Sequence, residues 1–338
     1  MFKKYCTFYL VIGIFLVLIL DAKTVLIGAK DGISLCIQTV IPSLFPFFIL
    51  STFITCNISS APTIILSPIG RLCRMPKGSE VLLLLGFLGG YPVGAKAVSE
   101  AYLDKKLSHE DAERIIGFCN NPGPAFIFGM VATLFHSTLI AWILWLINII
   151  AAIITAVVLP GKRSKKDFIS TQMPVKITDA MSKSLHIMAN VCGWVVIFRI
   201  IIAFIKRWFL HSLSMQGQIA IIGILELSNG CYFLSNITSE AQRFLFCSLF
   251  LTFGGLCVTM QTASQLNGLS LYVYLRTKLL QTLISALISV VLQPVLFNVT
   301  VPISIIPILS TCLFVAIITL RKSNRKKEWK LISKCSTI

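Results

Sequence analysis

Apolar runs long enough to cross a lipid bilayer recur along the whole chain, and they constrain its fold more than any other feature. A run of about 18 apolar residues is typical of a transmembrane helix. Six continuous runs are 6–26, 33–56, 137–160, 184–208, 277–297 and 302–320, and two interrupted runs are 113–135 and 241–263. Only 13% of the 338 residues are charged, against about 25% in soluble domains. We therefore expect an all-α polytopic membrane protein with about eight transmembrane helices.

Two shorter apolar pieces, residues 81–98 and 219–234, could cross the membrane or could enter and leave on one side as re-entrant segments. Basic residues separate the two topologies, because loops rich in Lys and Arg stay in the cytoplasm. If both pieces are re-entrant and both termini are cytoplasmic, most basic residues lie inside, including the run GKRSKK (161–166) and Lys278. A crossing segment at 81–98 would place that run outside unless another element failed to cross. We therefore expect two re-entrant segments in the cell membrane.

The net charge is +17. The basic residues responsible for it lie beside apolar runs, where such residues orient helices and meet anionic lipid headgroups. We therefore expect a bilayer with anionic headgroups as a partner, and no nucleic acid. The eleven cysteines include no CxxC pair, so we expect no metal site, no cofactor and no disulfide framework. The absence of HExxH, GxSxG and P-loop motifs argues against an enzyme. The sequence leaves a homo-oligomer open.

The order of landmarks indicates two repeats, each with a span, a short glycine-bearing piece, an interrupted helix and a second span. Three landmarks recur at equal spacing, as Ser108, Gly123, Ala132 and as Ser239, Gly254, Ala263. The expected topology inverts one repeat relative to the other, as in many secondary transporters; chance similarity of apolar segments is the alternative. The expected division is an N-terminal transmembrane helix (1–30), a first repeat (31–160), a basic cytoplasmic loop (161–183), a second repeat (184–298), a last transmembrane helix (299–320) and a basic cytoplasmic tail (321–338).

The stretch "GFCNNPGPAFIFGM" (117–130) interrupts a helix at membrane depth. Its prolines remove backbone N–H groups and clash with the preceding turn. Non-helical backbone at that depth is tolerated only where it is buried in protein or lines a polar cavity. Asn120 and Asn121 add amides that donate and accept hydrogen bonds. Asn120, Asn121 and Gly123 are therefore candidate solute-binding residues; the alternative is a proline kink whose asparagines join neighbouring helices.

The stretch "GFLGGYPVGAKAV" (86–98) favours a tight re-entrant turn, and Gly89 and Gly90 are candidate site residues within it. Close helix packing is an equally good explanation of its glycines. Lys96 places an ammonium group at membrane depth, where such groups are costly and are usually paired or functional. It could also reach the cytoplasmic face through its flexible chain.

The stretch "GILELSNG" (223–230) places Glu226 and Asn229 in an apolar run, and both are candidate site residues. One hypothesis pairs Glu226 with Lys96, so that both stay charged at low dielectric. A second gives Glu226 a role in proton coupling. Arg199, within another span, is an alternative partner for the same acid.

With "IPSLFPFFILSTF", "GFLGGYPVGAKAV", "ERIIGFCNNPGPAFIFG" and "GILELSNG", the chain resembles the YlbJ-type sporulation integral membrane proteins that carry a nucleoside-recognition (Gate) domain. The resemblance covers about residues 30–320. It implies a cytoplasmic-membrane protein of an endospore-forming bacterium that is needed for spore cortex formation. It also implies two Gate-like repeats and distant kinship with concentrative nucleoside transporters.

Two functions are consistent with these features. The first is a permease-like translocator that moves a small polar solute, nucleoside-like on the strength of the resemblance, through a cavity between the interrupted segments. The second is a non-transporting scaffold or assembly protein of sporulation, in which the interruptions only shape helix packing and the basic inner surface recruits partners.

Overall fold

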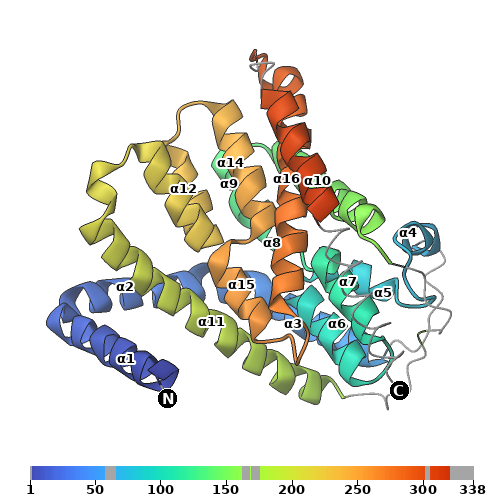
Figure 1. The fold of residues 1–338 in the computed structure, drawn as a ribbon, viewed down its shortest axis with the longest axis horizontal. Coiled ribbons are helices and arrows are strands. Elements are labelled where there is room, and N and C mark those ends of the chain that lie inside the picture. Colours follow the sequence, from blue (N-terminus) through green and yellow to red (C-terminus); the bar gives the residue numbers. More distant parts are fainter. Residues whose placement is uncertain (1, 58–65, 162–167, 169–175, 301–304, 320–338) are drawn as a thin grey trace.

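The computed structural model describes residues 2–57, 66–161, 168, 176–300 and 305–319. Within those ranges the chain is helical and has no strand. Helices from both halves of the chain pack into one body, with α16 beside α10 and α14 (Figure 1). The all-α fold is therefore confirmed for the described residues. Most of the expected basic loop (161–183) and the whole expected tail (321–338) lie outside the described residues.

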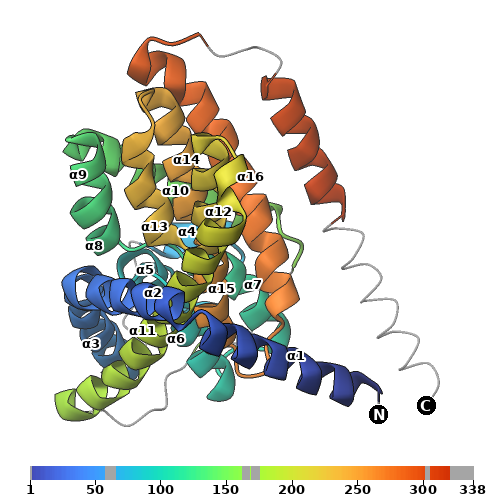
Figure 2. The same ribbon diagram turned by 90° about the vertical axis from the view of Figure 1, so that its left-hand side faces the viewer.

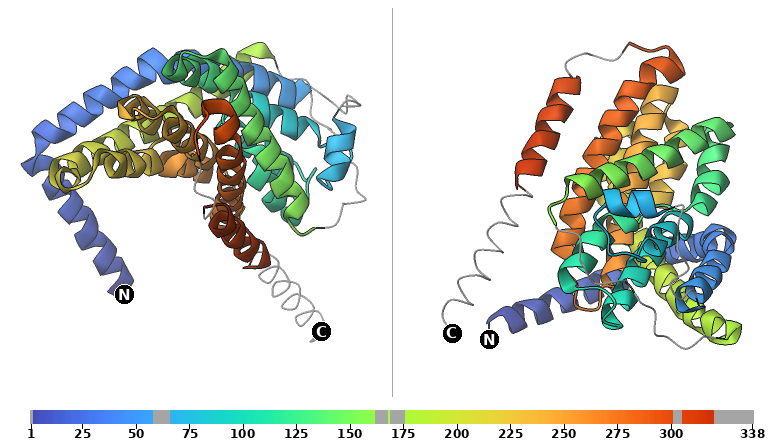
Figure 3. Two further views of the ribbon diagram at one scale, coloured as in Figure 1. Left: turned by 90° about the horizontal axis from the view of Figure 1, so that it is seen from above. Right: turned by 90° about the vertical axis from the view of Figure 1, so that its right-hand side faces the viewer.

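The N-terminal region bends sharply where one continuous span was expected. α1 (Phe2–Leu20) and α2 (Ala22–Leu35) meet at Asp21, and the two helices are bent by 92°. The Asp21 carboxylate accepts a backbone N–H from the first turn of α2, and Arg207 Nη1 lies 2.7 Å from Asp21 Oδ1. A capping carboxylate starts a new helix at this point. The prediction of one straight span over 6–26 is wrong, and α1 extends away from the body (Figures 2 and 3).

The second expected span, 33–56, is divided between three helical pieces. α2 passes into a π-helical turn at Cys36–Val40, and α3 (Ile41–Asn57) follows directly. The next helix among the described residues is the short α4 (Ser67–Leu72). A π turn inserts one extra residue per turn and often lies near a functional site.

The first short apolar piece forms a hairpin of two helices, α5 (Val81–Leu88) and α6 (Val93–Leu103). Both helices lie against the carbonyl group of Cys119. A Cβ atom would come 1.7 Å from that carbonyl oxygen at Gly86 and 1.9 Å from it at Gly94. Only glycine permits this approach of backbone to backbone.

The second short apolar piece folds back in the same way, as α12 (Met215–Leu225) and α13 (Leu227–Phe233). A Cβ atom at Gly230 would lie 2.4 Å from the Cα atom of Gly223. Both pieces are therefore helical hairpins, which is the shape expected of re-entrant segments. Whether each enters and leaves the membrane on one side stays a prediction.

Two long helices are broken in the middle. The first runs from α7 (His109–Cys119) through the non-helical residues 120–123, and continues as the short α8 (Pro124–Phe126). A π-helical turn (Ile127–Val131) and α9 (Ala132–Phe135) complete it. The interruption predicted from the Asn-Asn-Pro-Gly-Pro motif is confirmed.

The second broken helix consists of α14 (Glu240–Phe253) and α15 (Gly255–Ala263). Gly254 separates the two with a positive φ of 79°, which is accessible to glycine at low cost. Ser239 caps the start of α14 by accepting the Gln242 N–H.

Long unbroken helices complete the structure. They are α10 (Thr138–Val158), α11 (Ile177–Trp208) and α16 (Leu271–Phe297), with short 3₁₀ turns at Leu210–Ser212 and Leu234–Asn236. A further helix at Ile305–Thr319 packs against α10 and α16 and is visible beside α16 in Figure 2.

Five helices of the described residues are long and apolar enough to cross a membrane, or six if the bent N-terminal pair counts as one span. They are His109–Phe135, Thr138–Val158, Ile177–Trp208, Glu240–Ala263 and Leu271–Phe297. Helices of this length and composition support a membrane location. The expected count of about eight is not confirmed.

The loops gather at two opposite ends of the helices. One group comprises residues 73–80, 104–108, 159–161 and 264–270, and we call it the basic end. Hydrogen bonds join these loops: Arg74 Nη1 donates to the Gly161 carbonyl over 3.0 Å, and Asn267 Nδ2 donates to Ser99 Oγ over 3.1 Å. The other group comprises residues 136–137, 209–214 and 234–239.

Candidate functional site

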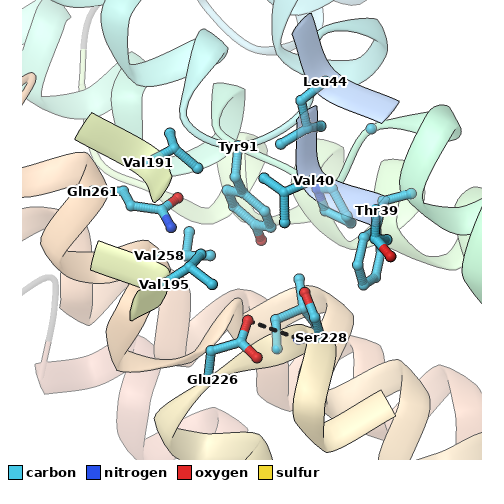
Figure 4. Close-up of a pocket in the computed structure, with 14 residues that line it drawn as sticks. Thr39, Val40, Leu44, Tyr91, Val191, Val195, Glu226, Ser228, Val258 and Gln261 are labelled. Atoms are coloured by element: carbon cyan, nitrogen blue, oxygen red, sulfur yellow. Dashed lines mark hydrogen bonds between the residues drawn. The ribbon is translucent and has the colours of Figure 1, made fainter. Parts of the chain in front are cut away.

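The interrupted segments of the chain meet around one small cavity of about 50 Å³ (Figure 4). The first hairpin contributes Tyr91 from its turn, and the first break contributes Pro122 and Gly123. The second hairpin contributes its turn, Glu226–Ser228, and the second broken helix contributes Val258 of α15. The π turn before α3 and the middle of α11 close the remaining sides.

Tyr91 is the side chain that links these segments. Its ring lines the cavity, and its hydroxyl group bonds to the carbonyl oxygens of Leu251 and Thr252, in the last turn of α14, over 3.1 and 3.0 Å. A Cβ atom at Gly254 would lie 3.3 Å from the Tyr91 ring. Tyr91 therefore connects the turn of the first hairpin to the break in the second broken helix.

Glu226 presents a carboxylate at the cavity wall, where it is 3% exposed. Its Oε1 accepts the Ser228 N–H over 2.9 Å, and its Oε2 accepts the Asn229 N–H over 2.7 Å. The Asn229 side chain donates a third hydrogen bond to Oε2 over 2.6 Å. These donors at the start of α13 hold the carboxylate in place.

The expected ion pair between Glu226 and Lys96 is not formed between these two described residues. Lys96 Nζ lies 3.6 Å from Glu100 Oε1, one turn further along α6. Nor does Glu226 pair with Arg199, whose buried Nε has no hydrogen-bond partner among the described residues. The two hypotheses failed because each assumed that a buried acid requires a basic side chain, whereas backbone N–H groups supply the stabilisation here.

Asn120 and Asn121, in the first break, are buried behind the cavity and do not line it. Asn120 Nδ2 donates to Thr262 Oγ1 over 2.9 Å and to the Tyr274 hydroxyl oxygen over 3.1 Å. Asn121 Nδ2 donates to the Phe118 carbonyl over 2.7 Å. These contacts tie the break to α15 and α16.

The candidate glycines lie at the junction of the first hairpin and the first break. A Cβ atom at Gly123 would lie 2.9 Å from the Gly90 Cα atom, so the two backbones touch. Gly90 also has a φ of 77°. Gly89 ends α5 as its C-cap and donates its N–H to the Leu85 carbonyl. Of the eight candidate residues, the structure brings Gly90, Gly123, Glu226 and Asn229 to the cavity or to its immediate support.

Lys278 is the functional candidate that the sequence analysis missed. It was assigned to the inner side, because it lies at the very start of the expected span 277–297. The helix begins earlier, at Leu271, and Lys278 is fully buried two turns into α16. Its Nζ donates to Asn121 Oδ1 over 3.2 Å and to Gln281 Oε1 over 2.9 Å, and lies 5.1 Å from the centre of the Tyr91 ring.

Lys278 belongs to a polar stripe along α16. The stripe continues through Gln281, Ser285 and Ser289, all buried. Ser285 and Ser289 both bond to Ser248 of α14 over 2.7 Å. Spacings of three and four residues place these side chains on one helix face, so this periodicity within the apolar run was the sequence signal that could have revealed the stripe.

The arrangement is suited to binding a polar molecule inside an apolar body. The cavity combines one carboxylate with the hydroxyl groups of Thr39 and Ser228 and the carboxamide of Gln261. Apolar walls with a few placed polar groups are typical of small-molecule sites. The described residues contain no group of three His, Cys, Asp or Glu side chains placed to hold a metal ion.

The chain is similar to the sporulation integral membrane protein YlbJ of Bacillus subtilis (strain 168), with 37% identity over 107 residues. The aligned part covers 31% of this chain and 26% of that relative, so about a quarter of the relative's length is matched. No model of a known protein family matches the chain, and no solved structure matches it significantly. The similarity supports the resemblance to YlbJ-type proteins, and nothing in these comparisons supports the Gate domain.

Proposed function

We propose that this protein is a permease-like translocator of a small polar solute that acts in sporulation. The observation that carries the proposal is the meeting of two hairpin turns, the first helix break and the half-helix after the second break around one cavity that Glu226 lines. Helix breaks leave backbone carbonyl and N–H groups without helical partners. Membrane proteins tolerate such groups where they line a cavity, and secondary transporters place them around the solute.

The course of the two broken helices supports two inverted repeats. In Figure 1, α7 lies below the first break and α9 above it, whereas α14 lies above the second break and α15 below it. The two broken helices thus pass the cavity in opposite directions. Two oppositely oriented units around a central site are the arrangement by which many secondary transporters open to either side in turn.

The size of the cavity indicates that it must open to admit a solute. Its volume of about 50 Å³ leaves room for only a few water molecules, at about 10–15 Å³ each. π-helical turns lie next to it, at Cys36–Val40 and Ile127–Val131. Such turns are weak points of helical hydrogen bonding and often accompany functional sites. We propose that α3 and α9 move about these turns.

The similarity to YlbJ supports the sporulation setting, and we extend it to a role in spore cortex formation. Basic residues at the basic end, among them Arg74, Lys77 and Lys105, support the proposal that this end lies in the cytoplasm against anionic lipid headgroups. A nucleoside is one solute class to test.

A scaffold function is the second candidate, and one observation favours it. The asparagines of the first break do not line the cavity. Asn120 Nδ2 donates to α15 and α16, and Asn121 Oδ1 accepts hydrogen bonds from Lys278 and Gln281 of α16. That use of polar side chains is the one expected if the break serves only helix packing.

A solute screen on the purified full-length protein separates these functions. Thermal unfolding in detergent is measured with nucleosides, amino acids and cell-wall precursors, because a bound solute stabilises the folded state by an amount that grows with the logarithm of its concentration relative to its Kd. We expect one class to raise the Tm of the wild-type protein. Thr39→Val removes a hydroxyl group from the cavity wall and should weaken that shift, whereas Thr155→Val, buried in α10 and bonded within its own helix, should not. No shift with any class favours the scaffold.

A further inference from the structure

Lys278 lies in an unusual environment for an ammonium group. It is fully buried, and within the part of the chain that the structure describes it has no ion pair. An ammonium group has three N–H donors. Two of them reach Asn121 Oδ1 and Gln281 Oε1, and Nζ also lies over the face of the Tyr91 ring.

An unpaired cation at this depth is costly. Burying a charge without a counter-charge destabilises a protein by several kcal/mol, and charged groups inside membrane proteins usually mark the path of a substrate or ion. The amide oxygens and the aromatic face around Lys278 compensate part of this cost. The position thus provides hydrogen bonds for the cation while it lacks a negative partner among the described residues.

Tyr91 lies between this cation and the cavity. The same ring that lines the cavity is 5.1 Å from Lys278 Nζ. Asn121, which accepts a hydrogen bond from Lys278, directly precedes the cavity residues Pro122 and Gly123. A displacement of the Tyr91 ring would therefore expose the ammonium group to a molecule in the cavity.

We propose that Lys278 binds a carboxylate group of the solute once the Tyr91 ring has moved aside. This inference rests on the proposed function and names the solute class. The cavity already contains the carboxylate of Glu226, which disfavours a multiply charged anion and favours a solute that also carries an ammonium group. An amino acid has both groups, one for Lys278 and one for Glu226. A bound carboxylate supplies the missing counter-charge through charge-assisted hydrogen bonds.

The test compares amino acids with their amides on the purified full-length protein. A panel of L- and D-amino acids, the matching amino-acid amides and nucleosides is screened by thermal unfolding. We expect an amino acid to bind the wild-type protein, and its amide, which lacks the carboxylate, to bind about tenfold more weakly or worse. This comparison needs no variant.

Two variants test whether the preference for an amino acid over its amide depends on Lys278. Lys278→Met removes the cation, and Asn121→Asp places a permanent counter-ion beside it; both should abolish the preference for the acid over the amide. Ser289→Ala, which removes a buried hydroxyl group from the same face of α16, should retain it. If Lys278→Met or Asn121→Asp fails to fold, the other of the two variants and the comparison of acid with amide on the wild-type protein still test whether a carboxylate binds at Lys278.

Three outcomes would overturn the inference. Equal binding of acid and amide, or an acid preference that survives Lys278→Met, excludes a carboxylate at Lys278. A nucleoside that stabilises the wild type and Lys278→Met alike would overturn this inference and leave the proposed function standing. No stabilisation by any solute would count against the proposed function itself.

Discussion

At the scale of single residues, Glu226 shows how an acid can be retained inside an apolar body without a basic partner. Three N–H donors from the start of α13 hold its two oxygens. Glu226→Gln replaces one acceptor oxygen with an NH₂ group that faces donors. We expect it to lower the free energy of unfolding by about 1–3 kcal/mol, the usual cost of an unsatisfied buried polar group. Glu100→Gln, in the partly exposed pair with Lys96, should cost less than about 1 kcal/mol. Thermal unfolding in detergent measures both, and equal effects would contradict this role of Glu226.

A double-mutant cycle tests whether Lys96 acts on Glu226. Because Lys96 pairs with Glu100, Lys96→Met should not rescue Glu226→Gln. The effects of the two changes on the free energy of unfolding should add within about 0.5 kcal/mol. Restoration of stability in the double variant would show that the two side chains are coupled.

The sequence predicted which residue types gather at the breaks but not their partners. Asn120, Asn121, Glu226 and Asn229 were chosen because each is a polar group at membrane depth, and all four are buried in the structure. Lys278 was missed because a basic residue at the start of an apolar run is normally a flanking residue. Helix α16 begins six residues before the expected span. The hydrogen bonds of Lys278 to Asn121 and Gln281 depend on tertiary packing, which a span boundary does not reveal.

At the scale of helices and hairpins, glycine decides how closely the first hairpin approaches α7. A Cβ atom at Gly94 would lie 1.9 Å from the Cys119 carbonyl oxygen, so backbone must move to admit one. We expect Gly94→Ala to destabilise the protein by about 3 kcal/mol or more, at the upper end for overpacking. Gly193→Ala, in α11 with no atom within 4 Å of the added Cβ, should be neutral or stabilise by up to about 1 kcal/mol. Thermal unfolding compares the two, and similar effects would show that the contact is loose.

Sequence patterns located the interruptions well and the ends of elements less well. Proline and glycine act on the backbone of their own neighbourhood, so the break after Cys119 and the turn at Gly254 were predictable. The bend at Asp21 was not, because its ion pair with Arg207 joins residues far apart in the sequence. The span 33–56 was divided by a π turn for which the sequence carries no clear signal.

At the scale of the whole molecule, the distribution of charge gives a testable orientation. The loops of the basic end carry Arg74, Lys77, Lys105 and Lys106, whereas the loops of the opposite end carry no Lys or Arg. Lys206, Arg207 and Arg243 lie in the helical turns next to the opposite end. We expect the basic end to face the cytoplasm. In a background without native cysteines, Lys105→Cys should resist a membrane-impermeant maleimide added to intact cells, and Ser212→Cys should react. The reverse pattern would invert the topology.

Native Cys73 is a cysteine that we expect not to react with the maleimide. It is buried at the basic end, and burial raises the pKa of its thiol to about 11. At neutral pH the thiol is therefore protonated, and the thiolate is the form that reacts. We expect Cys73 to stay unlabelled in the folded wild-type protein even after the membrane is opened, which mass spectrometry of the labelled protein can check.

The central claim is that the interrupted segments surround a hollow that water can reach. The rate of modification of Ser228→Cys by a small cationic methanethiosulfonate reagent in native membranes tests it most directly. Ile224→Cys, in the same hairpin but 49% exposed on its outer face, is the matched control. Because only a hydrated thiol ionises readily, we expect Ser228→Cys to react at least about tenfold faster than Ile224→Cys. Equal rates, or a faster reaction of Ile224→Cys, would contradict the claim.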